Sequence, residues 1–139
     1  MAKPNSFIDQ YRKSAVSTAS PLQLVIMLYD GALRFMEAGK HSMSLQDRYE
    51  QNESLKKAQR ILTELLSTLD TEKGGEVAKN LFSLYSYAHS RLVDANLEDD
   101  PEPIDEAIEI VSTLRESWVD LERQSRNVGI VSEEASGAA

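Results

Sequence analysis

The sequence predicts an all-α protein, an antiparallel up-down four-helix bundle formed by a single domain at residues 1–126. Apolar residues recur at spacings of three and four through most of the 139 residues, as they do along one face of a helix. Turn and cap residues divide this pattern into four long segments. No segment alternates apolar and polar residues as a half-buried strand does. Long helices joined by short turns pack as antiparallel neighbours, which gives the bundle.

The first long helix is predicted at about 20–45. Ser20 is a favoured N-cap residue, and Pro21 suits the first helical position, where its missing N–H costs nothing. Residues 1–19 come before this signal and are only loosely apolar. We expect them to form a short N-terminal cap segment, whose apolar residues include Phe7, Ile8 and Tyr11.

The second and third helices are predicted at about 49–70 and 76–96. Leucine and alanine recur every three or four residues in the first of these ranges, and Gly74 and Gly75 then break the pattern. In the other range one stripe is expected to face the core, with Phe82, Tyr85 and Val93 beside it. That stripe consists of Val77, Leu81, Leu84, Ala88, Leu92 and Ala95.

The fourth helix is predicted at about 101–125, after the N-cap residue Asp100. Trp118 lies on its apolar stripe, and we expect this side chain to anchor the core. The last segment, 127–139, is small, polar and acidic. We expect it to be a disordered C-terminal tail.

The composition excludes several classes of protein. Cysteine is absent, which rules out disulfide scaffolds, thiolate zinc sites and cysteine nucleophiles. Fifteen Lys and Arg face 23 Asp and Glu, a net charge of −8, and no basic patch suits nucleic acid. The longest apolar run, 24–29, is too short to span a membrane, and the first residues lack the apolar stretch of a signal peptide. We expect a soluble cytoplasmic protein.

No constellation of catalytic or metal-binding residues is visible. Phosphate-binding and nucleophile motifs are missing. A carboxylate-bridged metal pair in a bundle uses two Glu-x-x-His motifs, whereas Ala38 precedes His41 and Ser86 precedes His89 at that spacing. We expect His41 to be solvated and His89 to be partly buried. The sequence therefore predicts no enzyme, no catalytic or metal site and no cofactor; metal analysis would test the alternative of a metal enzyme.

The helix that starts at Ser20 has more apolar surface than one side of a bundle requires. One stripe runs from Leu22 to Met36, and a second, roughly opposite stripe consists of Leu24, Met27, Leu28, Gly31 and Phe35. Two interpretations are open. Either this helix is the most buried of the four, or a detachable segment covers the second stripe, as helix-in-groove partners do.

The junction between the cap segment and this helix has a specific sequence. It is YRKSAVSTASP at 11–21, followed by LVIMLYDGA at 24–32. This stretch closely resembles the FliS family of flagellar secretion chaperones. Shorter matches follow in order at Lys57-Ala58-Gln59, Gly74-Gly75-Glu76, Leu84-Tyr85 and Ala95-Asn96. The likeness covers about residues 7–121.

The resemblance implies a four-helix bundle that binds the disordered C-terminal region of flagellin. Such chaperones prevent premature polymerisation and deliver flagellin to the flagellar type III export apparatus. The resemblance also implies that Ile8 and Tyr11 cap a hydrophobic groove and yield to flagellin. The partner-binding residues are then Ile8, Tyr11, Leu24, Met27, Leu28, Gly31 and Phe35.

A second class of function stays open beside this one. The chain could be a regulatory adaptor that binds another flagellar protein through its acidic surface, and a homodimer is also left open. Salt distinguishes the two classes, because binding between exposed charges weakens as salt rises and apolar binding does not.

Overall fold

The computed structural model describes residues 20–138 as four α-helices. They are α2 (Pro21–Ser44), α3 (Arg48–Ser67), α4 (Gly75–Glu98) and α5 (Glu102–Ala138). No strand occurs in this part of the chain, so the predicted all-α four-helix class is confirmed. The predicted cap segment, with Ile8 and Tyr11, lies outside the described residues.

Local signals in the sequence determine where the helices begin. The backbone N–H of Gln23 donates to the hydroxyl of Ser20 over 3.1 Å, and the Ser20 N–H donates to the Gln23 side-chain oxygen over 2.9 Å. This reciprocal pair is a capping box, which satisfies two N–H groups that the helix itself leaves without partners. Asp47 caps α3 by accepting from the N–H of Glu50. The predicted start at Ser20 and Pro21 is therefore confirmed.

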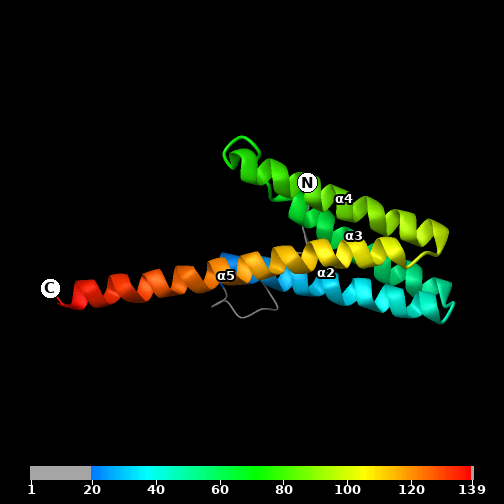
Figure 1. Cartoon of the computed structure of the whole chain (residues 1–139), viewed down its shortest axis with the longest axis horizontal. Coiled ribbons are helices and arrows are strands. Elements are labelled where there is room, and N and C mark those ends of the chain that lie inside the picture. The colour runs from blue at the N-terminus through cyan, green and yellow to red at the C-terminus, as the bar shows by residue number, and fades with distance from the viewer. Residues whose placement is uncertain (1–19, 139) are drawn as a thin grey trace, which may run out of the picture.

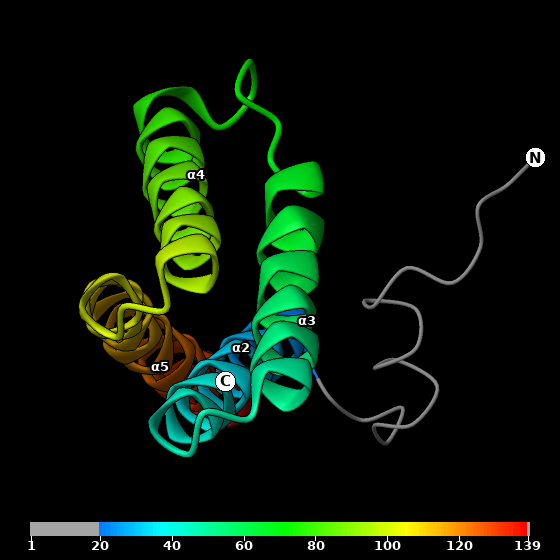
Figure 2. The ribbon, with the colours of Figure 1, turned by 90° about the vertical axis from the view of Figure 1, so that its right-hand side faces the viewer.

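Each helix packs against two neighbours: α2 and α4 both contact α3 and α5. Figures 1 and 2 show α2 and α5 side by side, with α3 and α4 crossing them. Toward the α3–α4 turn, α3 and α4 diverge from the other two helices (Figure 2). We call this the open end of the bundle. The opposite end, where the α2–α3 and α4–α5 turns lie, is the closed end.

The core lies between the helices and is built from leucine, isoleucine, alanine and two tyrosines. On α4 its residues are Ala78, Tyr85, Ala88, Leu92 and Ala95. The predicted core stripe of this helix is wrong at Val77, which is 69% exposed, and at Leu84, which is 37% exposed, whereas Leu81 packs against the core. The reason is the divergence at the open end, which leaves that flank of α4 uncovered. Trp118 packs against the core but is only partly buried.

The last helix is longer than predicted. The sequence indicated an end near residue 125, whereas α5 continues to Ala138 and extends past the other helices (Figure 1). Proline is the residue that breaks helices most strongly. No proline follows Pro103 in the sequence, so none interrupts the rest of α5. Once a helix is nucleated, each further residue adds a hydrogen bond at modest cost.

Two tyrosines join the diagonal helices α2 and α4 through the core. Tyr29 and Tyr85 are both buried, their rings lie 6.2 Å apart, and their hydroxyls are hydrogen-bonded to each other. The ring of Trp118 lies 6.4 Å from that of Tyr29. Burial raises the pKa of both phenols, because a phenolate is costly to remove from water.

These raised pKa values predict a loss of stability at high pH. The folded state favours the neutral phenols, so their contribution is complete below the ordinary tyrosine pKa of about 10 and declines above it, where the unfolded chain ionises first. Urea unfolding should therefore show a lower midpoint at about pH 11 than at about pH 8.

A Tyr29→Phe, Tyr85→Phe double variant should lose less stability over this pH interval. The control is Tyr49→Phe, which changes a tyrosine that is 69% exposed. If the double variant and the control respond to pH alike, the buried phenols are not responsible.

Candidate protein-binding surface

Most of the predicted second stripe of α2 lies against a neighbouring helix. Leu24 is 8% exposed, Leu28 is 1% exposed and Gly31 is buried. One turn beyond Phe35 on α2, a Cβ atom on Gly39 would lie 2.6 Å from Cδ2 of Leu55. The stripe thus approaches α3 closely. For these residues the structure favours the first interpretation, in which α2 is the most buried helix.

Two residues of the second stripe keep exposed surface. Met27 and Phe35 are both partly buried. The Phe35 ring has the Nζ of Lys57 at 5.5 Å and the guanidinium carbon of Arg34 at 5.7 Å from its centroid. A cation over an aromatic ring is favourable, so Phe35 already has partners on α2 and α3. Met27 is the member of the stripe that is most available to another chain.

The first half of α4 carries a larger exposed apolar surface. Val77 is 69% exposed, Phe82 49% and Leu84 37%. Phe82 borders a depression of about 390 Å³ whose other lining residues are Thr71, Lys79 and Ser83. The sequence predicted Phe82 beside the core stripe of this helix, and Val77 and Leu84 within that stripe.

A second depression lies between α4 and α5. It has a volume of about 270 Å³, and its apolar lining residues are Leu84, Ile110 and Leu114. We call this feature the α4–α5 groove. Leu121, two turns beyond Leu114 on α5, is 46% exposed. The groove therefore has further apolar surface in the direction of the open end.

Polar contacts join α4 to α5 on the side of the groove nearer the closed end. The hydroxyl of Tyr87 donates to Oε1 of Glu106 over 2.7 Å, and Nε of Arg91 donates to the same oxygen over 3.0 Å. The hydrogen bond from Tyr87, together with Arg91, lowers the pKa of Glu106. These charge-assisted bonds hold the two helices together at this point. The groove therefore continues toward the open end.

The sequence contained a signal for this surface. In the first half of α4, the buried face of Ala78, Leu81 and Tyr85 lies beside a second apolar face with Val77 and Leu84. One core-facing stripe does not need both faces. The sequence of α2 has the same excess of apolar residues, but neighbouring helices cover most of it.

The described residues contain no candidate metal site. Within residues 20–138 no group of three or more His, Asp or Glu side chains could hold a metal ion. His41 is exposed, and His89 is partly buried as predicted. Burial lowers the pKa of His89, which disfavours its charged form. Among the same residues, no helix is both long and apolar enough to cross a bilayer.

Comparisons with known proteins agree on one family. The model of the family described as flagellar protein FliS matches residues 4–125. The flagellar secretion chaperone FliS of Salmonella typhimurium is 41% identical over 107 residues, which cover 76% of this chain and 79% of that protein. The proteins of the same name from Vibrio cholerae and Bacillus subtilis are 35% and 33% identical. These two alignments cover 87% and 84% of this chain, and 92% and 89% of the relatives.

Truncating one leucine in the core and one at the groove should separate structural from surface roles. Leu28→Ala should reduce the free energy of unfolding by about 2–5 kcal/mol, because it leaves a cavity beside the buried tyrosines. Leu84→Ala should cost under about 1 kcal/mol, since this side chain is already partly in water. Urea unfolding of both variants measures this difference. Equal losses would contradict the assignment of Leu84 to a surface.

Proposed function

This chain belongs to the flagellar protein FliS family, and on that basis we propose that it is a cytoplasmic export chaperone for flagellin. It binds the C-terminal region of flagellin before assembly and prevents premature polymerisation. It then delivers flagellin to the flagellar type III export apparatus. The names of the relatives in Salmonella, Vibrio and Bacillus support a role in flagellar secretion.

The observation that carries this proposal is the exposed apolar surface at the open end. A disordered segment loses conformational entropy when it binds, so it needs a large apolar area in return. Val77, Phe82 and Leu84 supply such an area on α4, and the α4–α5 groove continues it. Two antiparallel helices with an apolar seam between them suit an amphipathic helix of the partner.

We propose that the flagellin site extends to Met27 and Phe35 on α2, and that the cap segment shields this part of the site in the free protein. Tyr11 precedes Ser20 by nine residues, and an extended chain of that length spans about 30 Å. Met27 lies about 10 Å along α2 from its start. Ile8 and Tyr11 can therefore fold back to Met27 and Phe35, the part of the second stripe that α3 leaves accessible. Leu24, Leu28 and Gly31 support this surface from the core.

A pair of serine substitutions on α4 tests the proposed flagellin site. Leu84→Ser should weaken binding of a flagellin C-terminal peptide by about tenfold, because burial of one leucine contributes about 1.5–3 kcal/mol. Leu97→Ser is the matched control, since Leu97 is 79% exposed on the same helix at the closed end. Titration calorimetry on the full chain gives both affinities.

Two results would contradict the proposal in different ways. If neither variant changes the affinity, the peptide binds elsewhere on the chaperone. If wild-type protein does not bind the peptide at all, flagellin is not the partner. Circular dichroism of each variant shows whether it is folded.

Deleting residues 1–11 tests the cap. If the segment competes with flagellin, affinity should rise by about tenfold for every 1.4 kcal/mol of docking energy that is removed. The solubility of the free protein should fall, because apolar surface becomes exposed. A lower affinity that Tyr11→Ala reproduces would mean that Tyr11 contacts flagellin directly, which contradicts a purely competitive cap.

A further inference from the structure

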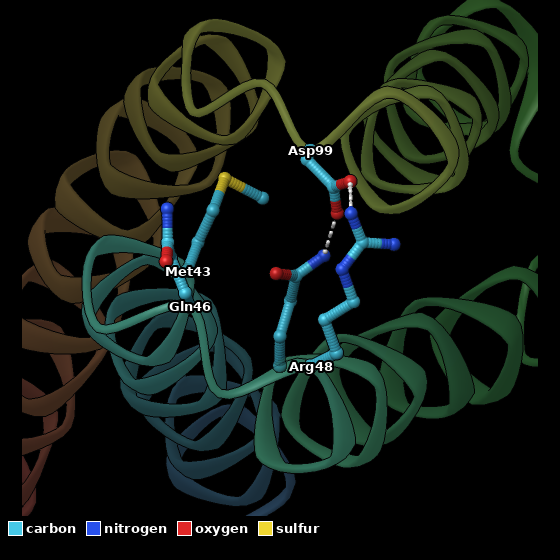
Figure 3. Close-up of a pocket in the computed structure, with 5 residues that line it drawn as sticks. Met43, Gln46, Arg48 and Asp99 are labelled. Carbon is cyan, nitrogen blue, oxygen red and sulfur yellow. Dashed lines mark hydrogen bonds and ion pairs between the residues drawn. The ribbon is translucent and has the colours of Figure 1, made fainter.

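A pocket lies at the closed end of the bundle, opposite the proposed flagellin site. Its volume is about 440 Å³, and it is lined by Met43, Gln46, Arg48, Gln51 and Asp99. In Figure 3, Met43 and Gln46 lie on one side of the opening, and Arg48 and Asp99 lie on the other. We call it the end pocket.

Hydrogen bonds between α3 and the end of α4 preform one wall of the end pocket. Arg48 pairs with the carboxylate of Asp99 over 2.6 Å (Figure 3). The side-chain nitrogen of Gln51 donates to Asn96 and to Asp99, each over 3.0 Å. Asn96 in turn donates to Asn52 over 2.8 Å. A network with several members holds its side chains in one arrangement.

One acceptor of Gln51 in this wall is open to the pocket and has no partner among residues 20–138. Gln51 is 3% exposed, and its side-chain nitrogen makes the two bonds just described. Its side-chain oxygen accepts no hydrogen bond from residues 20–138. No fully enclosed side-chain oxygen or nitrogen in this part of the chain lacks a partner, so this oxygen opens to the pocket. This oxygen can therefore accept a hydrogen bond from a donor that enters the pocket.

The charge around the end pocket favours a cationic donor. Residues 94–106, which join α4 to α5, contain seven Asp and Glu and no Lys, Arg or His. Among them, Glu98, Asp100 and Glu102 form no ion pair with any residue of 20–138. Carboxylates near a pocket attract cations and repel anions. These carboxylates would repel an anionic ligand. Arg48, the cation in the pocket lining, already pairs with Asp99.

We propose that the end pocket binds a lysine or arginine side chain presented by a second protein. The cationic group donates to the side-chain oxygen of Gln51 and to Asp99. Its methylene stem lies against Met43, as long basic side chains lie along apolar surface. Arg48 is 77% exposed, so its pairing with Asp99 contributes little and the arriving cation can displace it.

This site is separate from the proposed flagellin site and does not depend on it. Leu84 and Asp99 are fifteen residues apart along α4 and its cap, which corresponds to about 22 Å. A partner held at the end pocket therefore leaves the α4–α5 groove free. The chaperone could hold its cargo and a second protein at the same time.

The test uses small probes and the full-length protein labelled with nitrogen-15. Nα-acetyl-lysine N-methylamide is titrated in, with the norleucine derivative as the uncharged control of similar length. The lysine probe should shift the side-chain amide of Gln51 and backbone amides near residues 43–51 and 96–100 in a saturable way. The norleucine probe should bind at least about tenfold more weakly.

Two charge-matched variants locate the effect. Asp99→Asn keeps an oxygen that accepts from Gln51 and suits the left-handed backbone at this position, where φ is 53°. It should weaken the lysine probe by about fivefold or more. Asp120→Asn removes the same charge from α5, beside Arg123, and should leave the affinity unchanged within about twofold.

A third variant keeps the test decisive if Asp99→Asn fails to fold. Gln46→Glu adds a carboxylate at an exposed turn residue of the pocket and should tighten lysine binding by about threefold. The proposal is overturned if the lysine and norleucine probes bind alike, or if both aspartate variants weaken binding equally. Shifts spread over the whole acidic surface, or no saturation, would also overturn it.

Discussion

The packing of Tyr29 against Tyr85 is the constraint on which the rest of the bundle depends. These residues come from helices that are diagonal to each other, so two large side chains are needed to fill the space between them. Their hydroxyls satisfy each other in a core that offers few other partners. On α4, Ala78, Ala88 and Leu92 are buried like Tyr85, whereas Val77 and Leu84 lie on an exposed flank. The apolar surface of the open end lies on that flank, beside the face that this pair holds in the core.

An exposed apolar surface is a liability for a protein that has no partner. Such surfaces on soluble proteins mark binding sites or cause aggregation. Here the net charge of −8 opposes self-association of free molecules. The contacts of Glu106 with Tyr87 and Arg91 join α4 to α5 on the side of the α4–α5 groove nearer the closed end. Val77, Phe82 and Leu84 are exposed at the open end, whereas the exposed Leu45, Tyr49 and Leu97 lie at the closed end.

The fold could be predicted from the sequence because its signals are local. Ser20 and Pro21 start a helix through their own backbone chemistry, and the spacing of apolar residues marks each buried face. Periodicity alone could not show which of the two α2 stripes was available, because that depends on how closely α3 approaches at Gly39. It also could not show the exposure of Leu84, which follows from the divergence of α4. The end pocket was missed because it joins Gln51 to Asp99, residues far apart in the sequence and brought together by two turns.

The two ends of the molecule differ in the physical basis of recognition. Surface at the open end is apolar, and apolar burial depends little on moderate concentrations of salt. At the closed end an acidic connection surrounds the end pocket, and attraction between exposed charges is screened within about 8–10 Å at ordinary ionic strength. Cargo binding and attachment of a second protein would therefore respond differently to salt in the same molecule. Because a rigid helix, α4, separates the two proposed sites, each could be occupied without rebuilding the other.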